Sequence, residues 1–286
     1  MISIIISSYL PYYFSALEKN IAETIGVPYE IIKIDNPGLM GICEAYNKGA
    51  EKAQFDNLVF LHEDIIFKTT NWGNKLMLHL DKENTGLIGI AGSSYVPVAP
   101  SSWTMADKYN FVNIIQGYKQ NNDSVHIHST KENRTKVFAV DGVFLAIKKE
   151  NYTHIRFNEE LKGFHGYDLD FSLRVAKKFQ NYVIDDILIQ HFSQGNRDKQ
   201  WLDANITIKE KIGSNFPHQK NPETEKNIFL SFLYQYFIYY PITSKNILFT
   251  LKFFPFKYLR FQDKMLILKK YFNYIRFSSE INKKTQ

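Results

Sequence analysis

Cysteine is nearly absent from this chain: Cys43 is the one cysteine among 286 residues. That count excludes an internal disulfide and a zinc site built from several cysteines, which is typical of proteins in a reducing cytoplasm. The sequence also lacks an apolar run with the length and purity of a membrane-spanning helix. Its first residues, Met1–Ile6, carry no positive n-region, so we expect them to form a strand and not a signal peptide.

Glycine-rich phosphate loops are missing as well. The apolar segment Ile2–Ser7 is not followed by Gly-x-Gly-x-x-Gly, and no Walker lysine motif occurs. Both motifs work by bringing backbone N–H groups close to phosphates. Their absence argues against a Rossmann dehydrogenase and against a P-loop enzyme.

The chain otherwise has the composition of an ordinary globular protein, with 44% apolar and 22% charged residues. Its length suits one large α/β domain, or such a domain with an appendage. The net charge of +6 is unevenly distributed. From Lys245 to the end, ten lysines and arginines face two acids, Asp263 and Glu280, so the tail is basic and the rest is close to neutral.

Apolar runs alternate with helical patterns in the first third of the chain. The predicted elements are strands at Ile2–Ser7, Tyr29–Asp35, Leu58–His62 and Leu87–Ala91, and helices at Pro11–Thr24, Gly41–Ala53 and Trp72–Leu80. The initial β-α-β-α-β order predicts an α/β fold with a mostly parallel sheet and right-handed crossovers.

The middle of the chain is less regular. The polar segment Ser93–Lys136 predicts a long irregular insertion, which inside a compact domain is often functional. Val137–Lys148 predicts a pair of strands broken at Asp141-Gly142, and Tyr182–Gln190 predicts a further strand that ends at His191.

The most informative stretch is the third apolar run, which ends abruptly in His62-Glu63-Asp64. Open α/β sheets bind ligands at the carboxyl ends of their strands, where these side chains are expected. Carboxylate oxygens held there suit Mg²⁺ or Mn²⁺, and such an ion suits a diphosphate. The alternative is a strand followed by a solvated acidic turn.

Five pieces of the sequence together resemble the GT-A glycosyltransferases, in particular the family 2-like enzymes of bacterial surface-polysaccharide synthesis. In order they are Ile-Ile-Ser-Ser, Ile-Asp-Asn, Asn47, His-Glu-Asp and Gly-Tyr-Asp-Leu-Asp before a last strand with its histidine. The resemblance covers roughly residues 1–195. It implies a GT-A catalytic domain at residues 1–196, followed by a helical, aromatic and basic region at 197–286.

The resemblance also implies a binding site for a nucleotide-diphosphate sugar, with UDP as the expected nucleotide. The residues that it assigns to this donor are Ser7, Ser8, Asp35, Asn47, Glu63 and Asp141. Glu63 either contacts the ribose or points away from it. Asp141 would bind a sugar hydroxyl, and the alternative is a hairpin turn with Gly142 at positive φ.

A divalent cation, Mn²⁺ or Mg²⁺, is the implied cofactor. Asp64 aligns with the last acid of the family's Asp-x-Asp motif, and His62 replaces the first acid. His191 matches a histidine that completes the cation's coordination in relatives; the alternative is a structural surface histidine. A cation would stabilise the negative charge that develops on the diphosphate leaving group.

Asp168 aligns with the acid that deprotonates the acceptor hydroxyl in this family, and Asp170 is the alternative base. A wall of Phe164, Tyr167 and Phe171 would raise the pKa of this carboxyl and suit it to general-base work. A single base with direct displacement implies inversion at the anomeric carbon. The structural alternative for Asp168 is an N-cap of the helix that follows.

The tail suggests a further partner. Asn227–Ser244 and Phe253–Arg260 combine tyrosines and phenylalanines with nearby lysines, as in helices that lie in the headgroup region of anionic membranes. The alternative is a helical subdomain that packs on the body or on a second subunit. We expect a cytoplasmic enzyme with a glycan or lipid-linked glycan acceptor, and peripheral contact with the inner face of the membrane under the first alternative.

Two other functions compete with glycosyl transfer. A nucleotidyltransferase that makes nucleotide sugars would need a glycine-rich, basic loop after the first strand, and Ser8–Pro11 does not supply one. A non-catalytic module could bind nucleic acid or membrane through the basic aromatic tail. The neutral body with acids at its strand ends argues against a nucleic-acid partner.

Overall fold

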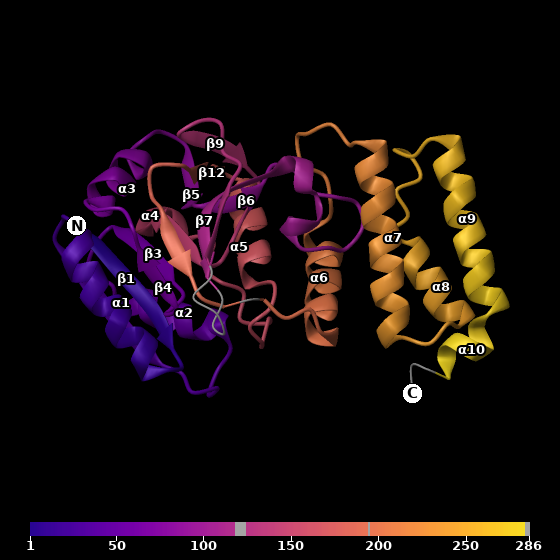
Figure 1. Cartoon of the computed structure of the whole chain (residues 1–286), viewed down its shortest axis with the longest axis horizontal. Helices are drawn as coiled ribbons and strands as arrows, with labels where there is room; N and C mark the ends of the chain where they lie inside the picture. The colour runs from indigo at the N-terminus through magenta and orange to yellow at the C-terminus, as the bar shows by residue number, and fades with distance from the viewer. Residues whose placement is uncertain (118–123, 194, 284–286) are drawn as a thin grey trace. The chain divides into compact units, whose positions relative to one another are not determined.

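The computed structural model describes residues 1–117, 124–193 and 195–283 (Figure 1). The chain divides into two compact units. The first unit contains Met1–Tyr95 and Asp107–Asn196, and the second contains Val96–Ala106 and Arg197–Gln286.

A seven-stranded sheet forms the centre of the first unit, with the strand order β2-β1-β3-β11-β5-β12-β9. These strands are β1 (Ile2–Ser8), β2 (Tyr29–Asp35), β3 (Asn57–Leu61), β5 (Thr85–Gly89), β9 (Arg134–Val137), β11 (Phe144–Lys148) and β12 (Gln180–Ile184). β1 is parallel to β2 and β3, and β5 is parallel to β12. Because β3 and β5 both run antiparallel to β11, they share one direction, and the predicted mostly parallel sheet is confirmed.

A second sheet has six strands, in the order β10-β6-β7-β13-β4 with β8 paired to β7. They are β4 (Ile65–Phe67), β6 (Ala91–Ser93), β7 (Asn110–Gly117), β8 (Ser124–His128), β10 (Ala139–Val140) and β13 (Ile189–His191). The prediction of an irregular segment at Ser93–Lys136 was therefore wrong for β7, β8 and β9, while residues 118–123 lie outside the described part. The alternation Val-His-Ile-His in β8 is a strand pattern that the polar composition obscured.

The predicted strand Tyr182–Gln190 is in fact two strands in different sheets. β12 ends at Ile184 and belongs to the first sheet, whereas β13 begins at Ile189 and belongs to the second. Two consecutive acids, Asp185 and Asp186, lie between them. This break places His191 on the small sheet that also contains β4.

Helices cover both faces of the large sheet, which explains why its central strands β1 and β3 are mostly apolar. On one face, α1 (Pro11–Thr24) and α3 (Trp72–Leu80) pack on Ile2, Ile4 and Ile6 of β1. On the other face, α2 (Ile42–Lys52), α4 (Lys149–Thr153) and α5 (Tyr167–Ala176) pack around Ile5 and the neighbouring strands. Successive side chains of a strand point to opposite faces of the sheet, so the central strands carry apolar side chains on both faces.

The second unit is helical, as predicted for the tail. Its helices are α6 (Lys199–Ile212), α7 (Pro222–Tyr239), α8 (Ser244–Leu251), α9 (Phe261–Arg276) and α10 (Ser278–Asn282). Asp198 caps α6 by accepting from the Trp201 N–H, and Asn221 caps α7 in the same way. In the described part of the chain, no helix is both long and apolar enough to cross a membrane.

Candidate functional site

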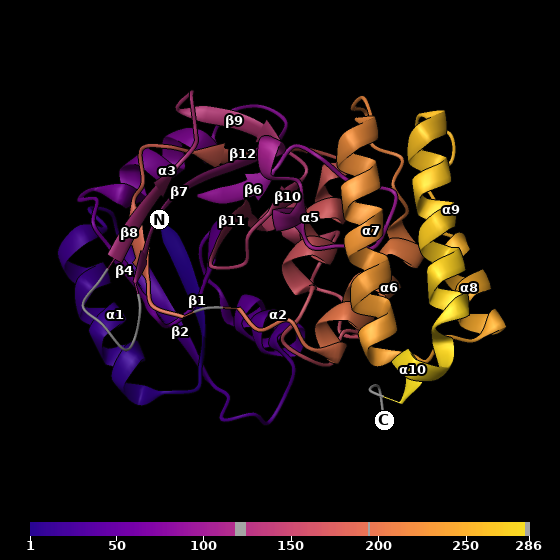
Figure 2. The same ribbon diagram turned by 45° about the vertical axis from the view of Figure 1, so that its right-hand side comes forward.

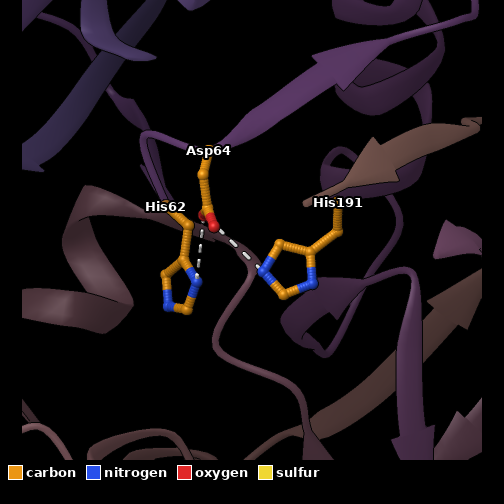
Figure 3. Close-up of side chains that lie close together, drawn as sticks. All are labelled: His62, Asp64 and His191. Atoms are coloured by element: carbon orange, nitrogen blue, oxygen red, sulfur yellow. Dashed lines mark ion pairs between the residues drawn. The ribbon is translucent and has the colours of Figure 1, made fainter. Parts of the chain in front are cut away.

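The carboxyl end of β3 brings His62 and Asp64 next to His191 (Figure 3). β13 runs antiparallel to β4 with His191 opposite Ile65, so the strand register itself places this imidazole beside Asp64. Asp64 Oδ1 lies 3.6 Å from His191 Nε2 and 3.9 Å from His62 Nδ1. The three side chains can each offer one ligand atom, all within 4.8 Å of one another.

Two hydroxyl groups contact these imidazoles. The Tyr167 hydroxyl lies 2.7 Å from His62 Nε2, which leaves Nδ1 of the same ring on the Asp64 side. A hydrogen bond on the far nitrogen fixes the ring orientation and tautomer of a histidine that binds a metal. Ser193 Oγ lies 3.0 Å from His191 Nε2, the same nitrogen that faces Asp64, so a cation bound there would replace this contact.

The donor set fits a divalent transition-metal ion. Two imidazole nitrogens and one carboxylate oxygen suit Mn²⁺ better than Mg²⁺, because Mg²⁺ prefers a shell of oxygens. Three protein ligands leave positions open for the oxygens of a diphosphate. The three residues are only partly exposed or buried, which strengthens the electrostatic effect of an ion held there.

Asp168 lies in the first turn of α5, directly after Tyr167. Its Oδ2 accepts a hydrogen bond of 3.2 Å from the Gly142 N–H, and the carboxyl of Asp141 is near. Burial of the carboxyl, followed by repulsion from Asp141, raises the pKa of Asp168 to about 7. The side chain retains partial exposure, so a substrate can still reach it.

The N-cap alternative for Asp168 was wrong, because Gly166 occupies the N-cap position of α5 at φ 74°. One part of the predicted apolar wall was also wrong. Tyr167 and Phe171 are buried, but Phe164 is half exposed and does not shield this carboxyl from water. Phe164 belongs to the loop before α5, where no strand or helix turns it inward.

Asp141 and Gly142 connect β10 to β11, and the hairpin alternative was wrong. β10 pairs with β6 and β11 pairs with β3, so the two strands belong to different sheets. Asp141 Oδ1 accepts from the Val143 N–H at 2.9 Å. Gly142 is required for space: a Cβ there would lie 2.0 Å from the Tyr167 hydroxyl oxygen.

Asp170 has a different environment from Asp168. It is buried and forms an ion pair of 2.6 Å with Arg174, one turn further along α5. The same guanidinium donates to the carbonyls of Ile155 and Arg156. This carboxylate therefore neutralises a cation that holds a neighbouring loop, and its role as the alternative base stays a prediction.

Glu63 links β3 to the start of α1. Its two oxygens accept from the Ser8 hydroxyl at 2.9 Å and from the N–H groups of Tyr9 and Leu10 at 3.1 and 2.8 Å. Glu63 thus orders the loop after β1, and its predicted contact with the ribose stays a prediction. Ser7, on the other side of the strand end, accepts from the Asn36 side chain at 3.2 Å.

Asp35 and Asn47 lie in separate surroundings. Asp35 ends β2, is paired with Lys33 at 2.6 Å, and lines a surface cavity of about 420 Å³.

Asn47 is buried in α2, where its amide binds the Phe157 backbone and the Glu159 carboxylate. These contacts give Asn47 a full set of protein partners, and its predicted contact with the donor stays a prediction.

The sequence did not predict the contacts of Tyr167 and Ser193 with the two imidazoles. It indicated Tyr167 only as part of an apolar wall, because its contact with His62 joins residues far apart in the chain. Ser193 could have been found, since it follows His191 by two residues and alternate residues of an extended segment share a side.

The sequence model of a family described as "Glycosyltransferase like family" matches residues 6–230, which is most of the chain. None of the curated proteins matches the sequence.

Solved structures share the fold at low sequence identity. TarS 1–349 of S. aureus is 12% identical with a TM-score of 0.56, and the match covers 99% of this chain and 88% of that one. TarS 1–349 in complex with UDP-GlcNAc is 13% identical with a TM-score of 0.52, and the match covers 82% of this chain and 72% of that one. GalNAc-T7 with UDP, GalNAc and Mn²⁺ is 11% identical with a TM-score of 0.51, and the match covers 73% of this chain and 47% of that one. This chain therefore spans less than half of the GalNAc-T7 structure, and the likeness concerns the GT-A fold alone.

Proposed function

This chain belongs to the glycosyltransferase-like family, and we propose that it transfers a sugar from a nucleotide-diphosphate sugar to a glycan hydroxyl. The observation that carries the proposal is the meeting of two groups at one edge of the sheet. A His-Asp-His cluster suited to a cation lies there, and Tyr167 connects it to Asp168, a carboxyl with a raised pKa.

His62, Asp64 and His191 would hold the cation, for which Mn²⁺ is the better match. When bound, such an ion stabilises the negative charge that develops on the diphosphate as the glycosidic bond breaks. The GalNAc-T7 structure contains Mn²⁺ together with UDP, which supports the same assignment here. Tyr167 would keep the imidazole of His62 in its binding orientation.

Asp168 would act as the general base. The acceptor hydroxyl oxygen attacks the anomeric carbon, the bond from that carbon to the diphosphate breaks, and the hydroxyl proton passes to Asp168. A pKa of about 7 suits this task, because a base works best when its pKa is close to the working pH. One displacement inverts the anomeric centre, so an α-linked donor gives a β-linked product.

The donor would lie along the carboxyl ends of β1, β2 and β3. Ser7, Ser8 and Asp35 remain the residues proposed for the nucleoside, and Asp141 for a sugar hydroxyl. UDP is the proposed nucleotide, since the TarS complex contains UDP-GlcNAc. Asn47 and Glu63 would act indirectly, by holding the loops that surround this space.

Donor turnover followed by NMR spectroscopy tests the proposal. The chain is incubated with Mn²⁺ and α-linked UDP-sugars, beginning with UDP-GlcNAc, and the anomeric proton of the released or transferred sugar is observed. We expect UDP release with a β-anomer as the first product. Release of the α-anomer would contradict the single displacement by Asp168, and failure with every UDP-, GDP- and dTDP-sugar would contradict the activity itself.

A further inference from the structure

The helix α9 has two apolar faces, and one of them is exposed. Its inner face packs against α7 through the ring pairs Phe237–Tyr274 and Phe229–Tyr271 and through the buried Ile267. Figures 1 and 2 both show α9 standing beside α7. These contacts hold α9 in the second unit, and none of them involves its other face.

The exposed face carries an apolar stripe along the full length of α9. Its residues recur at intervals of four, three, four and three positions, which align on one side of a helix. They are Phe261, Met265, Leu268, Phe272 and Ile275. Each of the five side chains is more than half exposed. A sixteen-residue helix is about 24 Å long, so the stripe is a continuous strip of apolar surface and not a set of scattered residues.

The charges beside the stripe have a single sign. Lys269 and Arg276 are exposed on α9, and the helical spacing puts both along one border of the stripe. The one acid of this helix, Asp263, is instead turned inward and paired with Lys226 of α7 at 3.3 Å. The outer surface of α9 is therefore apolar in its centre and positive at its border.

The segment just before α9 has the same character. Phe256 is exposed, and the Lys264 ammonium lies 4.0 Å from the centre of its ring. Lys257, Tyr258 and Arg260 are exposed in the same turn. Aromatic rings and cationic side chains mixed in this way match the boundary between lipid headgroups and acyl chains.

We propose that the stripe of α9 docks on an anionic lipid surface, with the helix axis parallel to the membrane. The apolar side chains would enter the boundary of the acyl chains, while Lys269 and Arg276 bind headgroup phosphates. Charge decides against a second copy of this chain as the occupant. Pairing two such stripes would bring Lys269 and Arg276 of both copies together, with no acid on the outer face of α9 to compensate them. This proposal does not depend on the proposed function.

Vesicle binding by the full chain tests the inference. The probes are vesicles of phosphatidylcholine alone and of two parts phosphatidylcholine to one part phosphatidylglycerol. We expect binding to the anionic vesicles only, weakened by salt. The double variant Leu268→Glu, Phe272→Glu changes exposed residues, so it should fold, and it should lose binding by about 100-fold or more. Lys269→Ala with Arg276→Ala should weaken binding about fivefold per charge.

Leu78→Glu is the control, because Leu78 is an exposed leucine on α3 of the first unit, 71% exposed against 51% for Leu268. This variant should bind vesicles like the unchanged chain. Sedimentation of the same proteins reports their oligomeric state. Equal vesicle binding by the stripe variant and the control would overturn the inference, as would no binding by the unchanged chain. A dimer that the stripe variant converts to a monomer, without vesicle binding, would assign the stripe to a second copy instead.

Discussion

Replacing Asp168 by asparagine should make the protein more stable and less active at the same time. The carboxyl has a pKa of about 7 in the folded chain, against an ordinary value of 3.8. The folded state therefore keeps this proton at pH values where the unfolded chain has already lost it. Folding stability falls as the pH rises from about 4 to about 7, and Asp168→Asn removes that loss.

The size of the effect follows from the pKa difference. Each pKa unit corresponds to about 1.4 kcal/mol, so between pH 5 and pH 7 the Asp168 carboxyl costs the folded state up to about 3 kcal/mol more. Because solvent reaches part of the side chain, we expect Asp168→Asn to gain about 1–3 kcal/mol relative to the unchanged chain over this range. Above pH 7 the gain should stay constant, since both states are then ionised.

Two measurements check this prediction. Urea unfolding at about pH 5 and about pH 8 compares the stability gain of the variant at each pH. Steady-state kinetics should show a loss of about 10²–10⁴ in kcat for the variant. In the unchanged enzyme, kcat/KM should fall tenfold per pH unit below pH 7. A stability gain that is the same at both pH values, or a variant with nearly full activity, would refute the role of this buried carboxyl.

Three further substitutions separate the groups around Asp168. Tyr167→Phe removes the hydroxyl that orients His62, and Mn²⁺ affinity measured by electron paramagnetic resonance should fall about 10–100-fold; an unchanged affinity would mean that the hydroxyl has no such role. Gly142→Ala places a Cβ 2.0 Å from the same hydroxyl oxygen, so it should lower stability by about 1–3 kcal/mol and reproduce the loss of Mn²⁺ affinity. Asp170→Asn leaves the Arg174 cation without its partner and should destabilise the fold by about 3–5 kcal/mol, as measured by urea unfolding, while activity per folded molecule is retained. A loss of turnover in the folded Asp170→Asn protein would transfer the role of base from Asp168 to Asp170.

Local sequence patterns predicted the large sheet well. β1, β2 and β3 and the helices α1, α2 and α3 lie where apolar runs and helical spacing indicated. Such patterns are strong when a strand is buried on both faces, because every position must be apolar. In the small sheet, β7 and β8 were missed because their residues are mostly polar or partly exposed, and the pairing of β7 with β13 joins distant parts of the sequence.

The candidate site could be predicted only in part, because its residues meet through contacts between distant parts of the sequence. Motif order suggested His62, Asp64 and His191 together, and the antiparallel pairing of β13 with β4 brings them together. Spacing alone could not distinguish Asp168 from Asp170. The difference lies in Arg174, which neutralises Asp170, and in Asp141, whose charge acts on Asp168. These are tertiary contacts that no local pattern encodes.

Calorimetric titration of UDP, with and without Mn²⁺, tests whether His62, Asp64 and His191 form a cation-dependent donor site. The proteins to compare are the unchanged chain and Asp64→Ala, which removes the carboxylate shared by the two imidazoles. We expect UDP to bind tightly only when Mn²⁺ is present, and Asp64→Ala to abolish this Mn²⁺-dependent binding. Equal UDP affinity with and without Mn²⁺, or in both proteins, would contradict a donor site built on His62, Asp64 and His191.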